Sequence, residues 1–404
     1  MRLRFPFLLI VFFLVSVAPV LSQKANRRPD VAWLALLEQN LAGAAAQYRM
    51  LVNNLPADSF PLAYYPQTGR LETCASDNWS SGFFPGTLLL LFGQTKDSSL
   101  YLEAVRRMKL LQKEQFNKSS PGLGCMLYNS FGNALRIAPQ AEYKHILINS
   151  ARSLASRFQP KVGCFPSRDS AGPGDFPVSI DNLGCLELLF WAAKATGDRS
   201  LYQVAVTHAN TTLRHHFRPD FGAYEVLLYD GRTGAVKRPR AARGAADSSA
   251  WARGQGWGLY GYTVLYRETR DPKYLEQAKN IARFILSHPR LPADKVPYWD
   301  FDAPAIPDAL RDASAGALMA SALLELGGYV DKKLAREYFG VADTLLHTLS
   351  SPEFRAAPGT NGGFLLQRCA GLPAPNGTVE GALPEGDYYY VEALQRYREY
   401  FRKK

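Results

Sequence analysis

The sequence predicts an all-α fold in which helical hairpins close into a toroid, and two observations support this prediction. First, apolar segments rich in small residues alternate with amphipathic segments that begin at a turn led by Asp, Gln or Gly. An apolar helix, a short turn and an amphipathic helix make an αα-hairpin with its apolar member on the inside. Second, strand-like stretches are few, and no low-complexity linker interrupts the chain.

Five hairpins are expected in the middle of the chain, and a sixth pair joins the first helix, at about 31–55, to the last, at 386–401. Six hairpins that close on themselves place the inner helices around a central pit. The repeat is structural, because the spacing of its turns is irregular. The inner helices are expected at 86–93, 126–137, 185–195, 258–268 and 315–326, and the outer helices at 97–111, 140–158, 197–213, 271–286 and 331–346.

The segments between the hairpins are long and irregular, and we expect them on one rim of the toroid. The clearest strand-like piece is AYEVLLYD, at 223–230. No linker divides the chain, so residues 23–404 are predicted to form a single domain. The rim segments are expected at 160–179, 229–250, 289–313 and 350–384.

Residues 1–22 have the parts of a secretory signal peptide: two arginines, an apolar run, and small residues before Gln23. A membrane anchor is the alternative, but the apolar run is short for a span. We therefore expect an exported protein, periplasmic or secreted, with no membrane attachment after cleavage of the signal. The five cysteines are too few for a disulfide scaffold, although one or two bridges are compatible with export.

The formal charge of +11 suits an anionic partner such as an acidic saccharide, a nucleic acid or a membrane. The basic residues are scattered, and the dense cluster at 237–243 is either an anion-binding loop or a solvated one. Charge alone leaves these partners open, and the family resemblance given below implies an acidic oligosaccharide and no nucleic acid. No cofactor and no metal are expected, because the chain lacks HExxH, P-loop and GxSxG patterns, and the glycines near Trp257 follow no strand.

Asp181 is the candidate catalytic acid. It stands between the extended FPVSI and the apolar helix LELLFW, so it falls near the helix N-cap or first turn. A carboxylate there gains stabilisation from backbone amides, and an ordinary cap is the alternative role.

Aromatic residues near helix starts form the candidate binding surface. Trp79 lies in a tight loop before one helix, where it either stacks on a sugar or fills the core. A second cluster, Trp251, Arg253, Gln255 and Trp257, lies around another helix start. Its i, i+2, i+4, i+6 spacing can direct two indoles, a guanidinium and an amide into one pit. Arg253 could pair with a substrate carboxylate, or with an internal Asp.

The acidic residues of a later loop have structural roles. Asp312 is expected to cap a helix, and Asp300 or Asp302 to bond loop amides.

Five motifs in this order resemble glycoside hydrolase family 88, the unsaturated glucuronyl hydrolases: SGFFPGTL, IDNLGCLELLFWAAKATGD, WARGQGWGLYGY, YWDFDAPAIPDALRDASAGALMASALLEL and GDYYYVEALQR. The resemblance implies an (α/α)6 barrel that removes a 4,5-unsaturated uronic acid from oligosaccharides made by polysaccharide lyases. An Asp protonates C4 of the enol ether, water adds at C5, and the hemiketal collapses. Asp181 matches the proton donor, and Trp79, Trp251, Arg253 and Trp257 match substrate-contacting positions.

The chain departs from the family pattern around this pocket. Gly122 stands where the family has a second catalytic Asp, and Glu225 replaces a His. The family's Thr-His-Gln-Gly sequence reads Ala241-Ala242-Arg243-Gly244 here. We expect an active glycosidase with altered specificity, in which Glu225 and Arg243 supply new polar contacts. The alternatives are a catalytically impaired saccharide-binding homologue, and an unsaturated rhamnogalacturonyl hydrolase like those of the related family 105.

Overall fold

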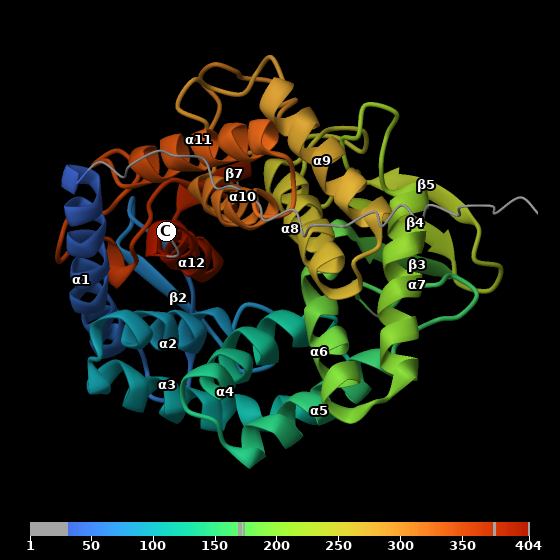
Figure 1. The fold of residues 1–404 in the computed structure, drawn as a ribbon, viewed down its shortest axis with the longest axis horizontal. Coiled ribbons are helices and arrows are strands. Elements are labelled where there is room, and N and C mark those ends of the chain that lie inside the picture. The colour runs from blue at the N-terminus through green and yellow to red at the C-terminus, as the bar shows by residue number, and fades with distance from the viewer. Residues whose placement is uncertain (1–30, 169–171, 173, 375–376, 403–404) are drawn as a thin grey trace, which may run out of the picture.

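The computed structural model describes residues 31–168, 172, 174–374 and 377–402, and its helices form a closed ring (Figure 1). The inner layer consists of α2 (Phe83–Thr95), η2 (Gly124–Gly132) with α4 (Asn133–Ile137), α6 (Leu186–Thr196), α8 (Ala252–Thr269), α10 (Ala313–Leu326) and α12 (Pro384–Arg402). The outer layer consists of α1 (Val31–Asn54), α3 (Ser98–Leu111), α5 (Ala141–Ala155), α7 (Arg199–His215), α9 (Pro272–Ser287) and α11 (Lys332–Leu349).

Each inner element packs against the next one around the ring, and α12 packs on α2 to close it. The pairs α2–α3, α6–α7, α8–α9 and α10–α11 are consecutive hairpins, and α1 contacts α12 although the two lie at opposite ends of the described chain. The predicted all-α (α/α)6 barrel is therefore confirmed.

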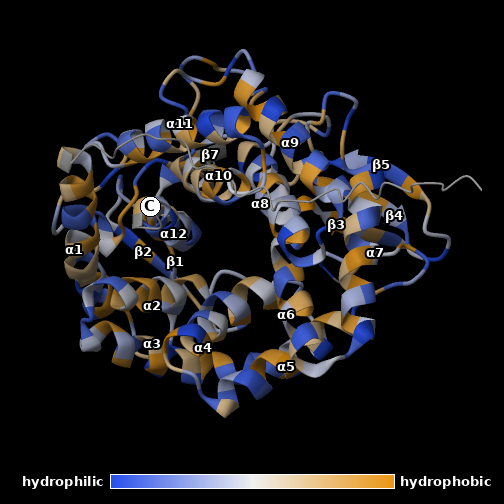
Figure 2. Ribbon diagram, in the orientation of Figure 1, coloured by the Kyte–Doolittle hydropathy of each residue, from blue (hydrophilic) through white to orange (hydrophobic). Residues whose placement is uncertain are grey.

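Among the described outer helices, α3, α7, α9 and α11 begin where the sequence provides an Asp cap. Asp97, Asp198, Asp271 and Asp331 have extended backbones, and their side chains accept a hydrogen bond from a backbone N–H two residues later. Such a bond satisfies one of the free N–H groups at a helix start. Hydrophilic and hydrophobic residues alternate along these helices (Figure 2), and their buried residues are mostly apolar.

Two inner segments differ from the simple helices that were expected. The segment 126–137 is divided into the π-helical η2 and the short α4, and Asp181 lies in a 3₁₀ turn, η3 (Ile180–Cys185), ahead of α6. The two irregular segments touch at Gly124, where a Cβ atom would lie 2.2 Å from the Cα of Cys185. Only glycine allows this approach, which brings the start of η2 against the segment that carries Asp181.

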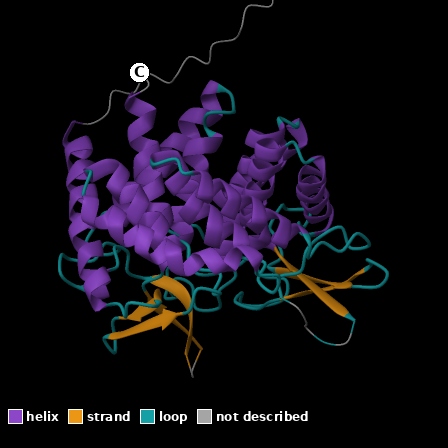
Figure 3. Cartoon of the chain, turned by 90° about the horizontal axis from the view of Figure 1, so that it is seen from below, coloured by secondary structure: helices purple, strands orange, loops and turns teal. Residues whose placement is uncertain are grey.

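Strands are more numerous than predicted from the sequence, because the rim loops contain short antiparallel strand pairs. Their three small sheets lie beyond the same end of the helices (Figure 3), which agrees with the expected rim. The piece expected at 223–230 forms β4, the central strand of one sheet. The strands are β1 (Phe60–Tyr65), β2 (Arg70–Cys74), β3 (Asp175–Ser179), β4 (Val226–Asp230), β5 (Val236–Arg240), β6 (Cys369–Ala374) and β7 (Gly377–Gly381).

The predicted signal peptide, residues 1–22, lies outside the described residues, and the single domain at 23–404 stays a prediction. Within the described part of the chain, none of the helices combines the length and apolar character that a membrane span needs. All five cysteines are free thiols, so no bridge is present, although the sulfurs of Cys125 and Cys185 lie 3.9 Å apart.

Candidate active site

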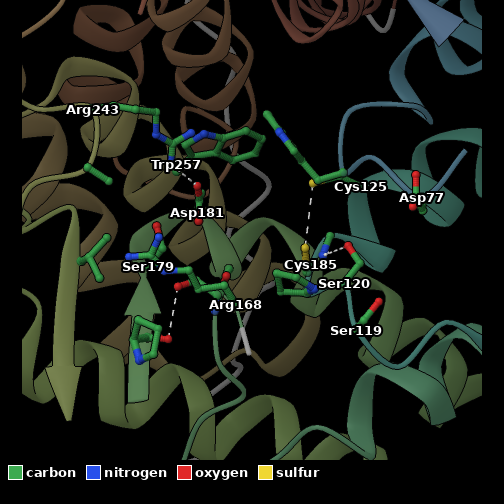
Figure 4. A pocket seen from close by; sticks show the side chains of 18 residues that line it. Asp77, Ser119, Ser120, Cys125, Arg168, Ser179, Asp181, Cys185, Arg243 and Trp257 are labelled. Carbon is green, nitrogen blue, oxygen red and sulfur yellow. Dashed lines mark hydrogen bonds and ion pairs between the residues drawn. The ribbon is translucent and has the colours of Figure 1, made fainter. Parts of the chain in front are cut away.

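A cavity of about 670 Å³ opens among the rim loops and the ends of inner elements. Its wall combines the loop before α2, the loop before η2, the 3₁₀ turn η3, and the segment that follows β5. Asp181 and Arg243 lie on one side of this cavity, and Asp77, Ser119 and Ser120 lie on the other (Figure 4).

Asp181 presents a partly open carboxylate to the cavity. Its side chain is 23% exposed, and Oδ2 accepts a 2.6 Å hydrogen bond from Nη2 of Arg243. Arg243 is the single side chain that donates to this carboxylate among the described residues. The remaining oxygen is therefore available to a ligand or to a proton.

Glu225 is buried behind the cavity wall and does not line it. Its carboxylate accepts backbone N–H bonds from Ala242, Arg243 and Gly244, and a 3.0 Å bond from Nε of Arg243. Glu225 therefore fixes both the backbone and the side chain of Arg243, and its buried position does not support the expected direct contact with substrate.

Trp251 supports Arg243 from the other side. The guanidinium carbon of Arg243 lies 4.0 Å from the centre of the indole, within cation–π range, while Trp251 itself is fully buried. Burial by itself lowers the pKa of Arg243, but the carboxylates of Asp181 and Glu225 outweigh it and raise the pKa. Arg243 is thus a permanently charged group held in one place.

Two tryptophans belong to the cavity wall itself. Trp79 is half-buried, packs edge-on against Phe83, and lines the cavity. Trp257 lines it from α8, and its buried Nε1 has no hydrogen-bond partner among the described residues. A buried N–H without a partner is costly, so a ligand oxygen that reached Trp257 would satisfy it.

The expected substrate contact by Arg253 is not supported by its position. Its Nη1 pairs with Glu385 at 3.0 Å and its Nη2 donates to the carbonyl of Ala370, and the side chain is 5% exposed. Gln255 bonds both the N–H and the carbonyl of Ala223. The side chains of Arg253 and Gln255 do not line the cavity, so the internal-pair alternative describes Arg253.

Gly122 lies at the cavity wall, in close contact with Trp79. A Cβ atom on Gly122 would lie 2.5 Å from the Cβ and 2.9 Å from the Cα of Trp79. The loop therefore cannot carry a carboxylate at this position without moving the Trp79 segment. The position of Trp79 therefore suits a glycine at 122.

Sequence reasoning missed several polar residues of the cavity. Asp77 precedes the aromatic loop of Trp79, Asn182 directly follows Asp181, and Arg168 lies in a rim loop. Asp77 lies close to Trp79 in the sequence and Asn182 is next to Asp181, and this adjacency was the signal that could have identified them. Nothing in the sequence indicates that the loops carrying these residues converge. Asp312 caps α10 and Asp300 accepts loop N–H groups, as expected. Within the described ranges no group of three or more His, Cys, Asp or Glu residues could hold a metal ion.

The arrangement can carry out acid–base chemistry on an anionic, ring-shaped ligand. One carboxyl faces the cavity beside a fixed guanidinium, and indoles provide flat apolar surfaces that suit sugar rings. An α/α toroid with such a pocket is suited to bind and process a saccharide.

The chain is similar to known proteins along most of its length. It is 40% identical over 369 residues to an unsaturated glucuronyl hydrolase of Formosa agariphila, which covers 89% of this chain and 91% of that protein. It is 31% identical over 357 residues to an unsaturated glucuronyl hydrolase of a Bacillus species, covering 84% and 91%. A crystal structure of an unsaturated glucuronyl hydrolase specific for heparin superposes with a TM-score of 0.87 at 41% identity, covering 92% and 98%. No protein-family model matches the chain. The chain belongs to the unsaturated glucuronyl hydrolases, glycoside hydrolase family 88, as the sequence motifs predicted.

Proposed function

We propose that this protein is an exported hydrolase that releases a 4,5-unsaturated uronic acid from lyase-generated oligosaccharides, with Asp181 as the proton donor. The observation that carries this proposal is the position of Asp181, whose carboxylate opens to the cavity and accepts a side-chain hydrogen bond only from Arg243 among the described residues. The similarity to a hydrolase specific for heparin supports a glycosaminoglycan-type substrate. Export rests on the predicted signal peptide.

In the proposed reaction, protonated Asp181 transfers its proton to C4 of the C4=C5 enol ether. The positive charge that develops at C5 is shared with the ring oxygen, and water adds to C5. Asp181, now a carboxylate, accepts a proton from this water. The resulting hemiketal opens and the aglycone leaves. A single carboxyl can serve as acid and then as base, because the two transfers are consecutive.

Trp79 and Trp257 suit sugar binding. The half-buried face of Trp79 provides a stacking surface, and Trp257 adds a second indole to the cavity wall. Altered specificity within the family is part of the proposal: the motif resemblance places Gly122 where the family has its second carboxylate, and the ion pair of Glu225 with Arg243 lies nearby.

The test is a panel of lyase digests of heparin, chondroitin, hyaluronan, ulvan and pectin, followed by the loss of ultraviolet absorbance as the conjugated enol ether is consumed. We expect turnover of one or more unsaturated glucuronides. Turnover of pectin digests alone would instead identify a rhamnogalacturonyl hydrolase. Unchanged absorbance across the whole panel would contradict the proposed activity.

A second candidate function, saccharide binding without catalysis, is favoured by one observation. The Cβ position of Gly122 is blocked by Trp79, so the second acid of the family has no direct substitute at this point of the wall. Calorimetric binding of the same oligosaccharides without any turnover would support this candidate over the hydrolase.

A further inference from the structure

Arg243 is the charged residue through which Asp181 is held in this structure. Three contacts define its position: Nε donates to Glu225, Nη2 donates to Asp181, and the guanidinium lies on the face of Trp251. Two of the three are made with buried groups behind the wall, so they persist whatever enters the cavity. The contact with Asp181 is made at the cavity surface, where a ligand can replace it.

The guanidinium also has donors to offer. An arginine side chain carries five N–H groups, and the carboxylates of Glu225 and Asp181 use two of those on Arg243. The other N–H groups have no acceptor among the described residues. Its side chain is 32% exposed and lines the cavity, in contrast to Arg253, whose donors are directed to Glu385 and Ala370.

The charges around Arg243 determine how a uronate carboxylate would affect Asp181. Asp181 and Glu225 together carry two negative charges against the one positive charge of Arg243. A uronate that bound Arg243 would add a third negative charge beside a single cation, and like charges favour protonation of one carboxyl. Glu225 is buried and accepts several N–H bonds, whereas Asp181 lines the cavity, so Asp181 is the carboxyl that solvent and ligand can reach.

We propose that Arg243 exchanges partners during binding: it holds Asp181 as a carboxylate in the free enzyme and passes to the uronate carboxylate of the substrate. Asp181, released from the guanidinium, takes a proton from solvent and then donates it to C4. Glu225 and Trp251 keep the guanidinium in place throughout. This inference rests on the proposed hydrolase function, and it assigns recognition of the acid group of the sugar to Arg243 and not to Arg253.

The test compares wild type, Arg243→Gln and Arg243→Lys on a heparin-lyase disaccharide and on the methyl ester of its uronate. Wild type is expected to prefer the free acid, and Arg243→Gln to lose about 10- to 100-fold of that preference, mainly through KM. Arg243→Lys keeps the charge and is expected to retain part of the preference. The matched control is Arg238→Gln, because Arg238 is exposed on β5, lies outside the cavity wall, and undergoes the same change of charge.

The pH profile provides a readout that a purely structural role would not move. Arg243→Gln removes the guanidinium that donates to Asp181, so the basic limb of kcat/KM is expected to move in this variant. An equal loss on acid and ester, with the basic limb unmoved, would overturn the inference.

Binding of a saturated glucuronyl disaccharide, which lacks the enol ether, separates this inference from the proposed function. If wild type binds it but turns over no unsaturated substrate, the hydrolase proposal fails. The role of Arg243 in recognition is then decided by calorimetry of Arg243→Gln: unchanged affinity refutes it, and a loss absent from Arg238→Gln supports it. Failure of wild type to bind or turn over any uronide would refute both proposals.

Discussion

Glu225 binds Arg243 twice, through the backbone N–H and through Nε of the guanidinium, while it remains buried behind the cavity wall. This double contact turns a loop arginine into a fixed part of the wall. Arg243 therefore lines the cavity, and Glu225 positions Arg243 without lining the cavity itself.

Substitution of Glu225 by Gln should disturb the site without removing a cavity-lining group. The amide replaces one acceptor oxygen with an NH₂ group that faces N–H donors, which costs about 1.5–3 kcal/mol where the bonds are charge-assisted. We expect turnover to fall about tenfold or more on that scale, with altered KM. The control is Asp175→Asn, which makes the same acid-to-amide change in an ion pair with Lys237 on the same sheet. Steady-state kinetics of the two variants are compared. Equal kinetics for both variants would show that Glu225 does not position Arg243.

Asp181→Asn should abolish most turnover, because an amide cannot donate the proton that C4 requires. Loss of a general acid commonly lowers the rate by roughly 10² to 10⁴. Asp77→Asn changes the acid on the opposite wall, and its loss of rate is expected to be at least about tenfold smaller than that of Asp181→Asn. Initial rates on the best substrate of the panel decide this, and full activity in Asp181→Asn would remove the proposed proton donor.

Restoring a carboxylate at position 122 should fail. Because a Cβ on Gly122 would lie 2.5 Å from the Cβ of Trp79, Gly122→Asp forces the aromatic loop to move, at a cost of about 1–3 kcal/mol. We expect a lower melting temperature and no gain in activity. Gly340→Ala is the matched control, since open space surrounds Gly340 in α11 and alanine there stabilises a helix by about 1 kcal/mol. A stable, more active Gly122→Asp protein would contradict this account of the wall.

Arg253 should matter for stability more than for recognition. Its removal leaves Glu385 buried without its cation, and breaking a buried ion pair costs about 3–5 kcal/mol. Burial already raises the pKa of Glu385, an effect that Arg253 opposes. Arg253→Met is therefore expected to unfold at clearly lower denaturant concentration, and a second change, Glu385→Gln, to recover part of the loss. A stable Arg253→Met protein with a raised KM would instead restore a substrate role.

Acid should destabilise the protein partly through His216. This histidine is buried, neither ring nitrogen has a partner within the described residues, and burial lowers its pKa to about 3. The unfolded chain binds a proton at His216 below its ordinary pKa of about 6.5, and the folded protein does not. Stability contributed by the neutral ring is therefore present above about pH 6.5 and is lost as pH falls toward 3.

His216→Phe keeps a ring stacked on Tyr229 and removes this titration. Its melting temperature should fall less than that of wild type between about pH 7 and pH 4. His145→Gln, at an exposed position of α5, is the control and should follow wild type. Parallel profiles for wild type and His216→Phe would exclude His216 as a source of acid sensitivity.

The sequence by itself determined the repeated hairpins, their Asp caps, the family and the position of Asp181 at a helix start. These features are local, because periodicity, capping and motif order are all read within a few residues. The sequence could also state that Asp312 caps a helix, since the acid and its N–H partners are neighbours.

Only the tertiary structure decided which polar residues reach the cavity. The spacing of Arg253, Gln255 and Trp257 was compatible with one pit, yet α8 directs Arg253 inward to Glu385, far away in the sequence. Arg243 reaches Asp181 across 62 positions because Glu225 and Trp251 hold its loop. Such contacts form between segments that are distant in the sequence. Their stability depends on how those segments pack, which no local sequence pattern reports.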